Sequence, residues 1–293
     1  MRPSRWLVVT ISVAATIVTT SGSASAVTSE VFLDNLSVFG GPSADSISIA
    51  CVGGLIKING QDPQTGAIGC GHIEQIYVRG GAGSDRITLV AVGPEDEFDG
   101  LGQVTVEGGP GDDVIDGSDS FDLLHGGSGY DVLRGGPRQD SFWPGPGGGE
   151  VNGGGGEFEQ LHVGGGGRWV VGATAARRFG VHPMVIPFTK IDGVYVVGGS
   201  GRDRIDTRRF RGIEVRLFGR KGADRLRAGH GYSELHGGPG ADVLDAGAGE
   251  DFLDGDRGRD LLKGRRGNDD LRGGPQVDEC RGGAGQDVRR SCE

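Results

Sequence analysis

Aspartate recurs at a fixed nine-residue interval in the second half of this chain, and glycine surrounds it. The segment 237–245 reads Gly-Gly-Pro-Gly-Ala-Asp-Val-Leu-Asp, and similar nonads follow it without a gap. Two more nonads precede it, so that eight stand in register over 219–290. Carboxylate oxygens repeated at regular spacing suit the binding of hard cations. The alternative is that each aspartate only solvates a turn, since aspartate is a common turn residue.

The nonad has the consensus G-G-x-G-x-D-x-U-x, in which U is apolar. A shorter run of four begins at Gly108, and isolated copies stand at Gly80 and Gly198. The glycines permit a tight turn with left-handed backbone angles, and x-U-x can form one short strand whose centre points inward. The residues predicted to point inward are Ile115, Leu124, Leu133, Leu226, Leu235, Leu244, Leu253, Leu262 and Leu271.

This pattern resembles the RTX, or haemolysin-type, calcium-binding repeat. The resemblance implies a parallel β-roll with two nonads per turn, in which repeats eighteen residues apart stack and Ca²⁺ lies between stacked turns. The ligands it implies are turn carbonyls and the sixth-position carboxylates. Carried onto this chain, the metal ligands are Asp113, Asp122, Asp131, Asp140, Asp224, Asp242, Asp251, Asp260, Asp269, Asp278 and Asp287.

Several repeats depart from the consensus. Ser233 replaces the sixth-position aspartate and should weaken the site it would share. Arg138 and Val277 replace the fourth glycine in the repeats of Asp140 and Asp278. Asp85 and Asp203 have no partner eighteen residues away, so we expect them to stand alone, and we expect the best sites over 224–287.

One apolar side chain per nine residues makes a thin core, which can hardly offset the ordering entropy of so much glycine. Glycine accounts for 61 of 293 residues. Bound metal can supply the missing stability. We therefore expect the chain to be largely unfolded without calcium.

The composition limits the partners. Basic residues number 30 and acidic residues 40, and a net charge of −10 argues against a general nucleic-acid binder. Arg202 to Arg227 is the exception, with ten basic residues against four acidic. This segment, 202–227, could bind an anionic surface polymer, or it could be a solvated face of strands.

The N-terminus has the form of a secretory signal peptide. Arg2 and Arg5 precede an apolar stretch at 6–18, and Ala-Ser-Ala at 24–26 is a cleavage signal. We expect a secreted protein without an integral membrane span, cut after Ala26. The four cysteines then favour disulfides. Three pairings are possible, and we expect the local ones, Cys51–Cys70 and Cys280–Cys292.

The remaining segments read as β-strands. Residues 46–49 and 55–58 alternate apolar and polar side chains. Residues 73–87 align with 191–205, which indicates an internal duplication. We therefore predict an all-β protein, a parallel β-roll or β-solenoid with β-rich leader segments. The predicted parts are a signal peptide (1–26), a leader (27–107), a first repeat block (108–160), a second leader (161–218) and a second repeat block with a C-terminal cap (219–293).

No motif for catalysis is present: His-Glu-x-x-His and Gly-x-Ser-x-Gly are both absent. His125 and His236 hold the ninth position of equivalent nonads, where they could flank strands or bind a metal. We predict an extracellular calcium-binding module with a structural or adhesive role, not an enzyme. The alternative is an enzyme that acts on polysaccharide, which would need acidic and basic side chains clustered outside the turns.

Overall fold

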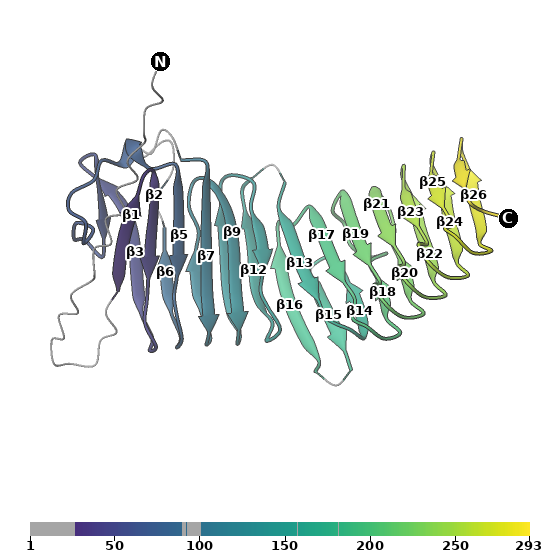
Figure 1. Ribbon diagram of the computed structural model, residues 1–293, viewed down its shortest axis with the longest axis horizontal. Coiled ribbons are helices and arrows are strands. Elements are labelled where there is room, and N and C mark those ends of the chain that lie inside the picture. Colours follow the sequence, from purple (N-terminus) through teal and green to yellow (C-terminus); the bar gives the residue numbers. More distant parts are fainter. Residues whose placement is uncertain (1–26, 90–91, 93–100, 157, 181) are drawn as a thin grey trace, which may run out of the picture.

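The computed structural model describes residues 27–89, 92, 101–156, 158–180 and 182–293. It is a β-solenoid in which two sheets face each other (Figure 1). The signal peptide predicted for 1–26 lies outside the described residues. None of the described segments forms a helix long and apolar enough to cross a membrane.

Sheet one contains thirteen strands among the described residues. In spatial order they are β1 (Thr28–Phe32), β2 (Asn35–Phe39), β5 (Gln75–Arg79), β7 (Gln103–Pro110), β9 (Phe121–Ser128), β11 (Ser141–Trp143), β13 (Gln160–Gly164), β17 (Gly193–Val197), β19 (Glu214–Phe218), β21 (Tyr232–His236), β23 (Phe252–Asp254), β25 (Asp270–Arg272) and β27 (Val288–Arg290).

Sheet two contains fourteen strands among the described residues. In spatial order they are β4 (Leu55–Ile58), β3 (Ser46–Val52), β6 (Arg86–Thr88), β8 (Val114–Asp116), β10 (Asp131–Gly136), β12 (Gly149–Gly154), β16 (Met184–Thr189), β15 (Ala175–Phe179), β14 (Arg168–Val171), β18 (Arg204–Asp206), β20 (Arg225–Arg227), β22 (Val243–Ala248), β24 (Leu261–Arg266) and β26 (Glu279–Ala284). One 3-10 turn, η1 (Cys70–His72), lies between β4 and β5.

The nonads stack in the predicted register. Leu133 lies beside Ile115 in parallel strands, and Leu244 lies beside Leu226, each pair eighteen residues apart. All nine predicted inward residues are completely buried, which confirms the parallel β-roll. Leu161 is buried as well, between the strands β11 and β17.

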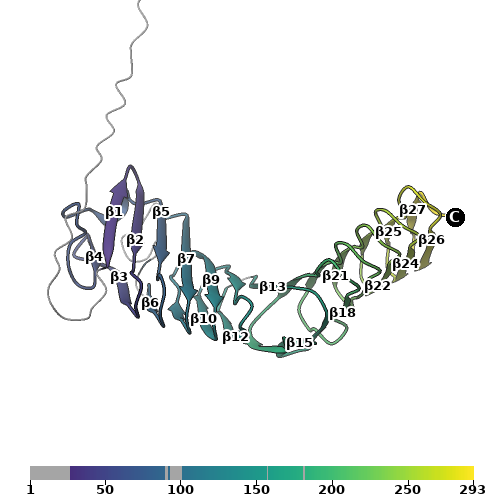
Figure 2. The same cartoon turned by 60° about the horizontal axis from the view of Figure 1, so that its bottom comes forward.

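The solenoid bends in the middle, where the two sheets differ in width. In sheet one, β13 pairs directly with β17. On the opposite side three strands intervene, because β14 and β16 each pair antiparallel with β15 between them. Strands added on one side only force that side to be longer, and β15 lies on the outer side of the bend (Figure 2). Sheet one continues through the bend without a break.

Aromatic rings stack along the outer face of sheet one, one ring per strand. Successive ring centroids are 4.2–5.6 Å apart. Four of the six ring contacts are stacked, with interplanar angles of 7–26°, and the other two are tilted. His125 thus lies within β9, and His236 is the last residue of β21. We call this set the aromatic column; its members are His125, Trp143, His162, Tyr195, Phe218, His236 and Phe252.

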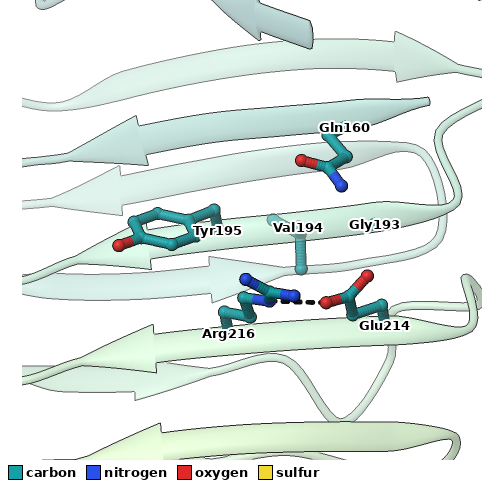
Figure 3. Close-up of a pocket in the computed structure, with 6 residues that line it drawn as sticks. All are labelled: Gln160, Gly193, Val194, Tyr195, Glu214 and Arg216. Carbon is teal, nitrogen blue, oxygen red and sulfur yellow. Dashed lines mark hydrogen bonds and ion pairs between the residues drawn. The ribbon is translucent and has the colours of Figure 1, made fainter. Parts of the chain in front are cut away.

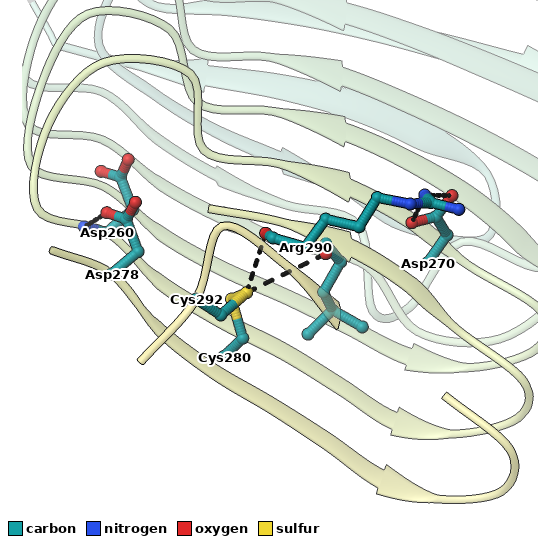
Figure 4. The surroundings of a disulfide bond; sticks show 7 residues. Asp260, Asp270, Asp278, Cys280, Arg290 and Cys292 are labelled. Carbon is teal, nitrogen blue, oxygen red and sulfur yellow. Dashed lines mark hydrogen bonds and ion pairs between the residues drawn. A yellow bond between two sulfur atoms is a disulfide. The ribbon is translucent and has the colours of Figure 1, made fainter. Parts of the chain in front are cut away.

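Both disulfides form as predicted. Cys51 bonds to Cys70 and fastens the β3–β4 hairpin to η1. Cys280 takes an inward position in β26 and bonds to Cys292 just after the last strand (Figure 4). Each bond closes the end of the solenoid at which it stands.

Candidate calcium sites

The sixth-position aspartates lie along the two edges of the solenoid. Edge one consists of the turns that lead into sheet two, and edge two of the turns that lead into sheet one. On each edge the backbone N–H of one carboxylate residue donates to a carboxylate oxygen of the next turn. For example, Asp224 N–H donates to Asp242 Oδ1 (2.6 Å), and Asp242 N–H donates to Asp260 Oδ1 (2.8 Å). We call each such series a carboxylate ladder.

The second block has one ladder on each edge, as predicted. Asp260 N–H continues the edge-one ladder to Asp278. On edge two, Ser233 N–H donates to Asp251, which is followed by Asp269 and Asp287. The repeats that lack the fourth glycine keep this geometry, because Asp278 and Asp140 both accept their ladder hydrogen bonds.

The first block also has two ladders, and they are longer than the nonads predict. Edge one runs through Asp45, Asp85, Asp113 and Asp131. Edge two runs through Asp122, Asp140, Glu159 and Asp192.

The expectation that Asp85 and Asp203 stand alone is wrong. Asp85 N–H donates to Asp113 Oδ1 (2.7 Å) across 28 residues, and Asp203 N–H donates to Asp224 Oδ1 (2.6 Å) across 21. Parallel strands bring these turns together because pairing depends on the strands and not on the length of the loop. Strand alignment in the leaders was the signal that could have placed them.

One carboxylate oxygen in most ladder residues has no hydrogen-bond partner. These atoms are buried, and none of them accepts a hydrogen bond from a described residue. A buried, uncompensated carboxylate oxygen costs free energy, so such atoms point to a cation. The atoms are Oδ2 of Asp85, Asp113, Asp131, Asp140, Asp224, Asp242, Asp251, Asp260, Asp269 and Asp278, and Oε1 of Glu159.

The first glycine of the nonad makes room for these oxygens. A methyl group on Gly237 would lie 2.5 Å from Asp242 Oδ2 and 2.9 Å from the carbonyl oxygen of Gly255, one turn further on. Gly219 stands in the same relation to Asp224 Oδ2 and the carbonyl of Gly237, at 2.6 Å each. Oxygens from two successive turns therefore converge beside this glycine.

Electrostatics favour the same interpretation. Burial, together with the charge of the neighbouring ladder carboxylates, raises the pKa of Asp242 and of Asp251 to about 7. The pKa of Asp140 reaches about 9 because of its burial and the charge of Asp122. These groups resist ionisation without a counter-charge, and a divalent cation would supply one.

Side chains alone do not make a complete site. Across the described ranges no group of three or more His, Cys, Asp or Glu side chains could hold a metal ion. Calcium takes six to eight oxygens, and backbone carbonyls are among its usual ligands. The converging glycine carbonyls therefore fit its needs together with the carboxylates. Transition metals that prefer nitrogen or sulfur fit poorly.

A cluster of acidic and basic side chains does lie outside the turns, on sheet one. Arg216 contacts Glu214 (2.5 Å) and Glu234 (3.5 Å) beside Tyr195 of the aromatic column (Figure 3). The charges pair with one another, and the hollow they border has a volume of about 10 Å³. That is room for about one water molecule, so the hollow does not favour a polysaccharide-acting enzyme.

Comparison with known proteins agrees with this geometry. A search of curated proteins finds no similar protein. The model of the RTX calcium-binding nonapeptide repeat (4 copies) matches residues 107–141, 233–262 and 254–288. RTX nonapeptide repeats bind Ca²⁺. The matched residues carry carboxylate ladders on both sides of the bend, and the chain therefore contains RTX calcium-binding repeats in two separate blocks.

Proposed function

We propose that this chain is an extracellular structural module whose folding depends on calcium. The observation that carries the proposal is the set of buried carboxylate oxygens without hydrogen-bond partners, repeated from turn to turn. Without cations these charges face one another across about 4.8 Å, the distance between neighbouring strands. With calcium between the turns, each ion offsets the repulsion and joins two turns of chain.

The ligands in this proposal are the predicted aspartates together with four residues that lie outside the matched repeats. Asp45 and Asp85 extend edge one toward the N-terminus, Glu159 extends edge two into the bend, and Asp203 begins the second edge-one ladder. Glycine carbonyls of the adjoining turns complete each site. An extracellular location is part of the proposal, since RTX repeats and two disulfides suit an oxidising compartment where calcium is abundant.

Far-UV circular dichroism of the purified protein tests the proposal. In EGTA we expect a spectrum of a largely unfolded chain, and on addition of Ca²⁺ we expect a β spectrum. Mg²⁺ at the same concentration is the matched control, because it demands a smaller octahedral site and gives up its water reluctantly. A β spectrum that is the same in EGTA and in Ca²⁺ would overturn calcium-dependent folding.

The adhesive role is a further part of the proposal. The folded module is long and presents two broad outer faces (Figure 1). Exposed basic residues of 202–227 offer contact with an anionic polymer. This role is tested by retention of the calcium-loaded protein on an immobilised acidic polysaccharide, with a neutral polysaccharide as the control. If the protein passed over both without a difference in retention, the adhesive role would be excluded.

A further inference from the structure

The basic residues of 202–227 do not form one surface. Arg216 lies on sheet one, where it is paired with glutamates. Arg208 lies in a loop and pairs with Asp206. Arg204 and Arg225 stand next to each other at the start of β18 and β20 on the outer face of sheet two.

Arg204 and Arg225 are part of a column of like charges. Arg168 of β14 is the cross-strand neighbour of Arg204, which is the neighbour of Arg225. Both Arg204 and Arg225 are exposed, and neither side chain makes a hydrogen bond or ion pair with any described residue. Like charges directly opposite one another on a sheet are destabilising, so this column costs stability in the isolated protein.

The neighbouring column shows that the sheet can avoid this cost. Two residues further along the same strands, Asp206 lies opposite Arg227, Arg227 opposite Asp245, and Asp245 opposite Lys263. Signs alternate there. The guanidinium of Arg168 lies over the ring of Phe179, 5.0 Å from its centroid, whereas the side chains of Arg204 and Arg225 have no such partner among the described residues. Their unpaired charge is therefore a local exception, and it calls for an anionic partner from outside the chain.

A groove lies beside these arginines. Its volume is about 490 Å³, and it runs along edge one past Arg202, Arg204 and Arg225. Ala223 and Ala241 hold the fifth positions of two nonads that stack on edge one, and their small side chains leave this space open. The remaining lining residues include Asp203 and Asp224, both almost fully buried members of the edge-one ladder.

We propose that this groove binds a linear acidic polysaccharide laid across the strands. This inference rests on the proposed calcium sites, because an ion held at Asp224 Oδ2, which has no hydrogen-bond partner, offsets the acidic lining of the groove that would otherwise repel an anion. Arginines on successive strands present positive charge about every 4.8 Å, which suits a polymer with closely spaced anionic groups. A flat anionic membrane reaches a recessed groove less well than a single chain does.

Two double variants with the same change in net charge test the inference. R204E/R225E reverses the charge of the groove. R257E/R259E is the matched control: both residues are exposed on the same edge and outside the groove lining, and their side chains pair with no described residue. All measurements use saturating Ca²⁺, and circular dichroism verifies that each variant is folded.

The probe is immobilised chondroitin sulfate, whose repeating disaccharide carries a carboxylate and a sulfate. We expect R204E/R225E to weaken binding by roughly tenfold or more and R257E/R259E to change it by less than about twofold, with binding lost at high salt. Three results would overturn the proposal that the groove binds an acidic polysaccharide. They are equal weakening by both variants, no binding by the folded wild-type protein at low salt, and binding only to phosphatidylserine vesicles. Absence of calcium-induced folding would instead contradict the proposed function.

Discussion

The backbone N–H of Asp242 donates to Oδ1 of Asp260, 2.8 Å away, although eighteen residues separate the two. The same carboxylate group leaves its other oxygen, Oδ2, buried and without a hydrogen-bond partner. One aspartate thus fixes the register between two turns with one oxygen and offers the second to a cation. Register and metal binding depend on the same side chain, and changes to either should affect both.

Restoring the missing aspartate at position 233 should add a calcium site. Ser233 is completely buried on edge two, and its N–H already donates to Asp251. We expect S233D to bind one more Ca²⁺ and to gain about 2 kcal/mol of unfolding free energy in saturating calcium. Calorimetric titration and urea unfolding measure the two effects.

The isosteric change S233N is the control for this prediction. It fills the same space without adding a charge, so it should leave the stoichiometry unchanged. If S233D and S233N behaved alike in calcium, the ladder carboxylates would not be the ligands.

A methyl group at the first glycine of a nonad should displace the carboxylate. In G237A the new carbon would meet Asp242 Oδ2 and the carbonyl of Gly255. We expect a loss of about 1–3 kcal/mol in calcium, together with weaker calcium binding. G201A is the control, because no atom lies within 4 Å of the position of its methyl group. Unfolding of both variants in urea checks the difference, and equal stability of the two would contradict the role of Gly237 in making room for Asp242 Oδ2.

The calcium-free protein should become less stable as the pH rises. Burial raises the pKa of Asp242 to about 7 in the folded chain, against 3.8 for an exposed aspartate. The folded form therefore holds more protons, and its stability is greatest below about pH 4 and is lost as the pH rises through about 7.

Far-UV circular dichroism of the metal-free protein between pH 4 and pH 8 measures this trend, since a chain that is largely unfolded at neutral pH should gain β structure as the pH falls. Calcium binding near pH 6 should also release protons, which appears as a dependence of the binding heat on the buffer. Stability that increased with pH in the metal-free protein would contradict the assignment of raised pKa values to the ladders.

The C-terminal disulfide should stabilise the last turns. Cys280 points inward in β26, and its bond to Cys292 closes a short loop next to the Arg290–Asp270 ion pair (Figure 4). We expect C280A/C292A to lower the unfolding free energy in calcium by about 3 kcal/mol. Hydrogen exchange should show the loss confined to β24–β27; protection lost equally near Cys51 would contradict a local cap.

The repeats could be predicted from the sequence because their spacing is constant. Nine residues place Leu244 and Asp242 in the same relation in every nonad, so the inward set and both edges of the second block follow from counting. Asp85 could not be placed in this way. Its ladder partners lie 40 and 28 residues away, and a fixed nine-residue spacing cannot allow for loops of unequal length.

Glu159 shows a second limit of the sequence. It follows Asp140 by nineteen residues and is a glutamate, so it fits neither the spacing nor the residue type of the repeat. Its longer side chain nevertheless reaches the N–H of Asp140. The bend could not be predicted either, because it arises from the antiparallel strand β15, which no periodic pattern indicates.

The aromatic column has a consequence for the order of assembly. It passes through the bend, from His125 to Phe252, where the edge-one carboxylates are interrupted between Asp131 and Asp203. Stacked rings need no cation, but edge two carries Asp140 and Glu159 through the same region. Contacts between the rings can thus form on the sheet-one side before calcium binds, whereas edge two of the bend closes only as its ions arrive.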